Sequence, residues 1–108
     1  MSEILRRVQA LISRGEYRVS QHGFRELVAD DILVGDALAS VAAAVVVEDY
    51  PDTRKEPSVL VLQHDREGRP IHVMWGIPKV EGTPAVLVTA YRPAPDRWSD
   101  DFLKRNKR

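Results

Sequence analysis

The chain has 108 residues, of which 44% are hydrophobic, and its 16 basic and 16 acidic residues give a formal net charge of zero. This length and composition predict one folded domain and exclude a disordered chain, and the balanced charge provides no overall field that would attract nucleic acid or a membrane. Because the chain contains no cysteine, disulfides, thiolate catalysis and cysteine-based zinc sites are excluded.

The first predicted element is an amphipathic helix that begins after Ser2, which is a suitable N-cap residue. Apolar residues recur at helical spacing from Ile4 to Ile12, and Gly15 suits the end of the helix. The start of the chain lacks the apolar core of a signal peptide, and no apolar run is long enough to span a bilayer. Together with the absence of cysteine, this leads us to expect a cytoplasmic protein with no membrane partner.

Two further helices are predicted before the strands begin. Residues 17–19 form a short extended piece that is a candidate strand, and Ser20 caps the second helix. The residues of this helix that we expect to point inward are Phe24, Leu27 and Val28. The third helix follows Asp30 and Asp31, and its expected inward residues are Val34, Leu38 and Val41.

Four strands are predicted in the second half of the chain, at residues 45–47, 59–62, 69–77 and 85–91. They are joined by a loop at 51–57, a hairpin turn at 65–68 and a loop at 78–84, and such short connections favour antiparallel pairing. The strands are apolar on both sides, so the helices should cover one face of the sheet, and the tail or a partner the other. The expected fold is α+β, with N-terminal helices packed on a four-stranded antiparallel meander sheet.

Several separated blocks of the sequence resemble a bacterial family called domain of unknown function 4258. The blocks are residues 17–22, 47–51, 57–62, 68–73 and 89–93, followed by Trp98. The order of the elements is also similar to that of the RelE/ParE/BrnT-like toxin superfamily. The resemblance implies a single domain over 1–108, with a RelE-like core at 17–93, a helical extension at 1–15 and a tail at 95–108.

The resemblance also implies a function, as an expectation. It implies a bacterial toxin of a toxin–antitoxin pair, acting as a metal-independent endoribonuclease without a cofactor. The implied partner is an antitoxin with a CxxC zinc ribbon, and the implied target is RNA. Many relatives carry an arginine four residues after the His22 position, where this chain has Glu26, preceded by Arg25.

RNA cleavage without a metal needs a base, an acid and a cation that stabilises the charged phosphorane. The catalytic candidates are His72, His22, Tyr91 and Arg92. The candidates for binding substrate are Arg25, Arg69 and Trp75, since arginine pairs with phosphate oxygens and tryptophan can stack on bases. A structural role is open for each: a buried strand histidine, a histidine at a helix start, or an aromatic core residue. The histidines lack the short spacing of a metal motif, so no metal site is expected.

The position of His72 on the sheet decides between these alternatives. If the 78–84 loop is centred near Glu81, His72 lies opposite Ala90 and shares a face with Arg92, whereas Tyr91 points to the other face. A shift of one residue reverses this arrangement. We expect the His72 ring to open onto water among guanidinium groups.

The tail and the mode of association leave alternatives open. Trp98 and Phe102 are spaced as a helical pair and should pin the tail to the body. Four of the last five residues are cationic, and they form either a solvated end or a contact with RNA or an acidic partner. The competing functional hypothesis is a non-catalytic protein-binding module with a toxin-like fold. A homodimer through the sheet or the first helix is a further hypothesis.

Overall fold

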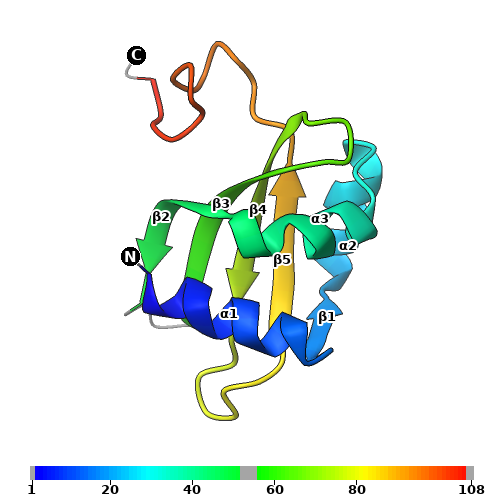
Figure 1. Cartoon of the computed structure of the whole chain (residues 1–108), viewed down its shortest axis with the longest axis vertical. Helices are drawn as coiled ribbons and strands as arrows, with labels where there is room; N and C mark the ends of the chain where they lie inside the picture. The colour runs from blue at the N-terminus through cyan, green and yellow to red at the C-terminus, as the bar shows by residue number, and fades with distance from the viewer. Residues whose placement is uncertain (1, 52–55, 107–108) are drawn as a thin grey trace.

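The computed structural model describes residues 2–51 and 56–106, and these residues form an α+β fold (Figure 1). The helices are α1 (Glu3–Ser13), α2 (Gln21–Ala29) and α3 (Val34–Ser40), and a 3-10 turn, η1 (Val41–Ala43), follows α3. The strands are β1 (Tyr17–Val19), β2 (Val45–Tyr50), β3 (Ser58–His64), β4 (Pro70–Gly76) and β5 (Ala85–Tyr91).

The five strands form one mixed sheet in the order β1-β5-β4-β3-β2. Strands β2 to β5 form the predicted antiparallel meander, but β1 adds a fifth strand that is parallel to β5. The prediction of a four-stranded antiparallel sheet is therefore wrong in strand number and in the direction of one pair. The flanking backbone holds β1 in place, since the N–H of Ala85 donates to the Glu16 carbonyl and that of Ser20 to the Leu87 carbonyl, each at 3.0 Å.

The predicted starts of the first two helices are confirmed, whereas α3 begins at Val34, with Leu33 as its N-cap, and not directly after Asp31. The Ser2 hydroxyl accepts a hydrogen bond from the Leu5 N–H at 3.0 Å, and the Ser20 hydroxyl accepts one from the Gly23 N–H at 2.9 Å. Gly23 has a second role, because a Cβ atom at this position would lie 2.5 Å from the Leu87 carbonyl oxygen. Glycine therefore allows α2 to lie directly against the edge of β5.

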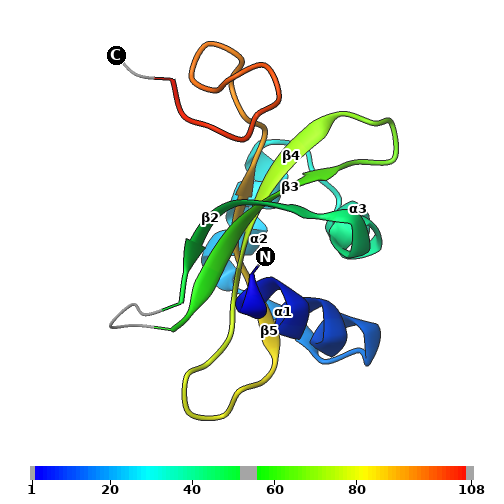
Figure 2. The ribbon, with the colours of Figure 1, turned by 60° about the vertical axis from the view of Figure 1, so that its left-hand side comes forward.

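Helices α1 and α3 cover one face of the sheet (Figures 1 and 2), and α1 contributes to the single core. The core residues from α1 are Ile4, Leu5, Val8 and Leu11, and those from β4 are Ile71, Val73 and Trp75. Helix α2 lies along the sheet edge instead, so it turns only part of its surface inward. As a result Phe24 and Val28, which were predicted to point inward, are 61% and 64% exposed. Val34, the first residue of α3, was also predicted to point inward and is 39% exposed.

The tail after β5 consists of turns and lies near the end of the sheet where β5 finishes (Figure 2). The predicted helical pairing of Trp98 and Phe102 is wrong, because Phe102 has a positive φ of 62°. Trp98 nevertheless pins the tail to the body, since it is only 5% exposed and its ring packs against His72 of β4. Residues 52–55 of the predicted 51–57 loop and the cationic residues at 107–108 lie outside the described residues.

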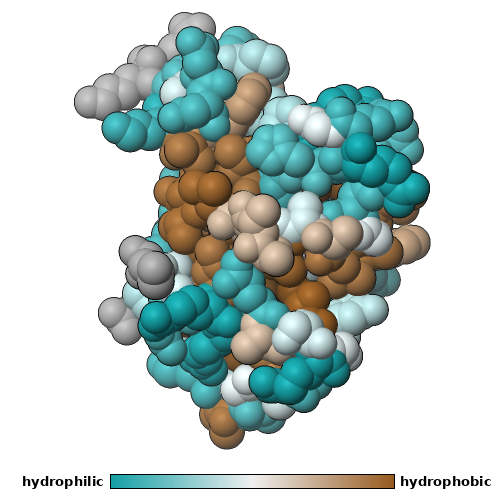
Figure 3. Space-filling view, in the orientation of Figure 1, coloured by the Kyte–Doolittle hydropathy of each residue, from teal (hydrophilic) through white to brown (hydrophobic). Residues whose placement is uncertain are grey.

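The helical face of the molecule keeps an exposed apolar band. Figure 3 shows this band as brown surface between the polar surface of α1 and the region of α3 and η1, continuing towards β2. Two hollows lie along it, between α1 and α3 and between α1 and β2. None of the described helices combines the length and apolar character needed to cross a bilayer.

Candidate functional site

The pairing of β4 with β5 places His72 opposite Tyr91, not opposite Ala90. Near the loop the predicted register holds, since Trp75 lies opposite Leu87. A β-bulge then adds one residue of β5 to the ladder, so the remainder of the strand is shifted. His72 therefore shares a face with Tyr91, and the prediction that it shares a face with Arg92 is wrong.

His72 is completely enclosed, so the expectation that its ring opens onto water is wrong. One ring nitrogen, Nδ1, lies 3.1 Å from the Tyr91 hydroxyl, and the other, Nε2, lies 2.8 Å from the Phe102 carbonyl oxygen. The Trp98 ring packs edge-on against the imidazole with 4.4 Å between ring centroids. The tail is thus the cover of this site.

These contacts select one protonation state of His72. The Phe102 carbonyl can only accept, so Nε2 carries the proton, and Nδ1 accepts from the Tyr91 hydroxyl. Burial lowers the pKa of His72 below 6.5, and the Phe102 carbonyl opposes this shift only in part. Burial likewise raises the pKa of Tyr91. The pair is therefore neutral at neutral pH.

We expect the free energy of unfolding to decrease as the pH falls below 6.5, the ordinary pKa of His72. Because burial lowers the folded-state pKa, the unfolded chain binds a proton that the folded chain excludes, so this contribution is complete above 6.5 and lost towards the lowered pKa. The charged groups near the ring are Glu48 and Arg105. A hydrogen bond from Arg105 lowers the pKa of Glu48 below its ordinary value of 4.5, so Glu48 titrates at lower pH than this range. Chemical denaturation across this pH range measures the slope, and an equally steep slope in the His72→Gln variant would assign it to another group.

A second set of polar groups joins the tail to the body beside His72. The Arg105 guanidinium makes two hydrogen bonds to the Glu48 carboxylate, at 2.9 and 3.1 Å, and lies 4.8 Å from the centre of a Trp98 ring. The Tyr50 hydroxyl also donates to Glu48. Imidazole, phenol, carboxylate and guanidinium groups are therefore brought together at one place, as the cluster of His72, Tyr91, Glu48 and Arg105.

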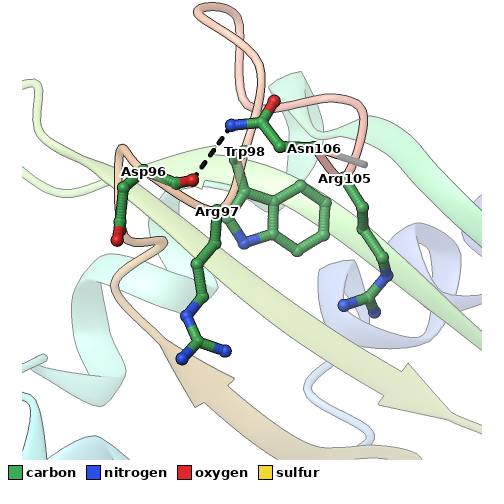
Figure 4. A pocket seen from close by; sticks show the side chains of 5 residues that line it. All are labelled: Asp96, Arg97, Trp98, Arg105 and Asn106. Atoms are coloured by element: carbon green, nitrogen blue, oxygen red, sulfur yellow. Dashed lines mark hydrogen bonds between the residues drawn. The ribbon is translucent and has the colours of Figure 1, made fainter. Parts of the chain in front are cut away.

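The open side of the tail forms a shallow hollow of about 440 Å³. Figure 4 shows Arg97 and Arg105 on either side of the Trp98 indole, with both guanidinium groups extending the same way, and the Asn106 amide donating to the Asp96 carbonyl at 3.1 Å. Trp98 offers almost no free surface here because it is 5% exposed. The hollow therefore presents cations, and no aromatic face for base stacking.

Two of the predicted arginines belong to a different cluster, around Asp65. Arg92 lies 3.0 Å from one Asp65 oxygen and also donates to the Asp30 carbonyl, while Arg69 lies 3.0 Å from the same oxygen. Burial opposes ionisation of the Asp65 carboxyl, but two backbone N–H groups, followed by the Arg92 guanidinium, hold its pKa at about 2 instead of 3.8. Arg92 thus ties the β3–β4 hairpin to the segment after α2, and Arg69 closes the hairpin turn itself.

The remaining predicted site residues lie elsewhere. His22 and Arg25 are exposed on α2 and have no hydrogen bond to His72 or Tyr91 among the described residues. Trp75 is fully buried in the core, where its indole N–H donates to the Gln63 side chain at 2.9 Å. Within the described part of the chain, no group of three metal-binding side chains comes together.

Two members of the His72 cluster, Glu48 and Arg105, were missed as site residues. They are 57 positions apart in the sequence, and no motif or spacing connects them. The only signals were an acidic residue in a predicted strand and a cationic chain end. Sequence reasoning therefore identified His72 and Tyr91 but not the groups that the tail brings to them.

The sequence was compared with protein families, curated proteins and solved structures, and only the family comparison gives a match. A family model described as Domain of unknown function (DUF4258) matches residues 19–92, which is more than half of the chain. The chain belongs to the DUF4258 family. The DUF4258 match includes His72, Tyr91 and Glu48, whereas Trp98 and Arg105 lie beyond it. No curated protein and no solved structure matches the chain.

Proposed function

We propose that this DUF4258 chain is a non-catalytic protein-binding module with a toxin-like fold, and that it works as one half of a toxin–antitoxin pair. The observation that supports binding is the α2 surface, defined here by Phe24, Val28 and Leu33. These side chains are 61%, 64% and 53% exposed, although all three are large and apolar. Phe24 and Val28 lie one helical turn apart on α2, and Leu33 directly precedes α3. Exposed apolar surface of this kind on a small domain marks interaction sites.

The contacts of two predicted catalytic residues, His72 and Arg92, and of one predicted substrate-binding residue, Trp75, support a non-catalytic role. The His72 ring is fully enclosed, Arg92 is bound to Asp65, and Trp75 lies in the core. Acid–base chemistry requires a group within hydrogen-bonding reach of the substrate. The His72 and Trp75 side chains are closed to solvent, and the Arg92 side chain, which is 27% exposed, is already bound to Asp65. The zero net charge also disfavours RNA binding.

Co-expression tests the proposal. The partner is a neighbour-encoded protein with a CxxC zinc ribbon, and the two chains should co-purify as a stable complex of fixed stoichiometry. The purified DUF4258 chain alone should leave RNA intact. RNA cleavage that disappears in the His72→Ala variant would contradict the non-catalytic proposal, and the absence of any complex would contradict the binding proposal.

The α2 surface should contain the residues that contribute most to that complex. Replacing Phe24 by Glu should weaken binding about thirtyfold, which corresponds to about 2 kcal/mol for an aromatic hot spot. Isothermal titration calorimetry with the zinc-ribbon partner measures the change. The matched control is Val80→Glu, because Val80 is 93% exposed in a loop distant in sequence from α2, and equal affinities for the two variants would place the interface elsewhere.

The His72 cluster supports a second candidate, a metal-independent endoribonuclease of the RelE/ParE/BrnT type. The cluster contains a base, an acid and a cation in one place, as phosphodiester cleavage needs. This activity would require the tail to move away from the ring. The Trp98→Ala variant should then gain RNA cleavage, and the double variant Trp98→Ala/His72→Ala should lose it again; a variant with a loosened tail and no cleavage would exclude this candidate.

A further inference from the structure

We infer that two copies of this chain associate through the outer edge of β2, with the β2 strands antiparallel to each other across a twofold axis. This interface goes beyond the proposed function, because the zinc-ribbon partner is placed on the α2 surface at the other side of the sheet. Strand β2 is at one end of the strand order, and α2 lies against β5 near the opposite end.

The first observation is the free hydrogen-bonding edge of β2. Among residues 2–51 and 56–106, β2 pairs only with β3. Every second residue of β2 directs its backbone N–H and C=O away from β3, and these groups have no strand partner. The other terminal strand, β1, has only three residues, whereas β2 has six. A long free edge is a template for another strand.

The second observation is the composition of this edge. Its first half is the segment Val45–Val47, with Val45 47% exposed and the other two valines partly exposed. Proteins usually protect an edge strand with lysine, proline or a short length. This segment has neither residue type. A β-bulge lies between Val46 and Glu48, so Val47 is the bulged residue, whereas Val45 and Val46 keep the regular register with β3. We therefore place the pairing on Val45–Val47.

The third observation is the apolar surface next to the edge. A hollow of about 510 Å³ lies between α1 and β2, and its lining includes Leu5, Gln9 and Val46. A second hollow of about 540 Å³ shares Gln9 and continues between α1 and α3. Figure 3 shows the resulting apolar band running to the region of β2. The unpaired backbone edge and the apolar surface are thus adjacent.

A second copy fits this combination because a strand edge is complementary to itself in antiparallel pairing. A twofold axis perpendicular to the sheet keeps both α1 helices on the same face, so the two hollows lie on that face, one on each side of the paired β2 strands. Three paired residues alone bury less than the roughly 500 Å² of surface per partner that a specific interface needs. The surface of the hollows beside α1 adds to the buried area.

The charges near β2 permit this approach. Glu48 is bound to Arg105 of its own chain, and Asp49 accepts a hydrogen bond at 2.9 Å from the Ser2 hydroxyl. The two acidic side chains of each strand therefore have partners within their own chain. Pairing two β2 strands therefore does not bring unpaired carboxylates face to face.

Sedimentation equilibrium of the full chain, from low micromolar to millimolar concentration, tests the inference. We expect a reversible monomer–dimer equilibrium. The Val45→Lys/Val47→Lys variant should weaken dimerisation at least about tenfold, since edge lysines oppose strand pairing. The matched control is Val28→Lys, which makes the same type of change at an exposed valine of α2 and should leave the dimer unchanged.

Each outcome decides the inference. A wild-type chain that stays monomeric at every concentration would overturn it, as would a dimer that persists in the double-lysine variant or that only Val28→Lys disrupts. If the double-lysine variant does not fold, hydrogen exchange of the wild-type chain replaces it. The amides within Val45–Val47 that point away from β3 should become more protected with rising concentration, and unchanged protection would overturn the inference. A zinc-ribbon complex that forms without any dimerisation leaves the proposed function intact, so the two failures are distinguishable.

Discussion

Replacing Trp98 by Ala should expose His72 and raise its rate of modification by diethyl pyrocarbonate about a hundredfold. Trp98 is 5% exposed and packs against both the His72 ring and the Arg105 guanidinium, so its removal takes away the main apolar contact of the tail. Truncating a buried tryptophan costs about 3 kcal/mol at the lower end of its range, which increases the open population by about two orders of magnitude. Peptide mass spectrometry follows the modification of each histidine separately.

The experiment contains its own controls. His22 and His64 are exposed in the native chain and should react quickly in every variant. Lys104→Ala changes an exposed tail residue and should leave the slow rate of His72 unchanged. If His72 reacts as quickly as His22 in the native chain, the tail does not enclose the ring.

Replacing Asp65 by Asn should reduce the free energy of unfolding by about 3 kcal/mol, because removing one member of a buried ion pair leaves its partners uncompensated. The Asp65 side chain is 2% exposed and binds both Arg92 and Arg69, and Arg92 is itself only 27% exposed. Chemical denaturation at neutral pH measures the loss. Glu67→Gln is the control, because its ion pair with Arg69 is exposed on both sides and should contribute less than about 1 kcal/mol.

The same carboxylate gives a pH dependence that is separate from that of His72. The pKa of Asp65 is about 2 in the folded chain and 3.8 ordinarily, so its contribution to stability is complete above 3.8 and is lost as the pH falls towards 2. The Asp65→Asn variant should show a flatter decline over this interval. Parallel declines in the two proteins would show that the carboxylate is not the group responsible.

The meander and the first two helix caps could be predicted from the sequence because each depends on local chemistry. Serine is a favoured N-cap residue, and Ser2 and Ser20 each directly precede a helix and cap it. The short turn at residues 65–68 requires the two strands that it joins to pair as neighbours. Residues 17–19 could be recognised as an extended piece and a candidate strand, but three residues carry too little pattern to place them in the sheet as a fifth strand. Its pairing depends on where α1 and α2 deliver the chain along β5.

The site was predictable only in part, and for a specific reason. The loop centre near Glu81 correctly gives Trp75 opposite Leu87, but the bulge beyond it moves Tyr91, in place of Ala90, to the position opposite His72. A shift of one residue along β5 decides which side chains share a face with His72, and the position of the bulge that causes this shift depends on the packing of the whole sheet. The enclosure of His72 depends on tail turns, including the positive φ of Phe102, for which the sequence gives no local signal.

The most direct test of the central claim is a long-range ¹H–¹⁵N NMR spectrum of the histidine rings at neutral pH. The structure requires a neutral His72 ring with its proton on Nε2, held by the Phe102 carbonyl and protected from exchange with water. We expect a sharp Nε2 proton signal and a titration midpoint below 6.5. A ring that exchanges freely with solvent and titrates at 6.5 or above would contradict the enclosed site and restore the open catalytic centre.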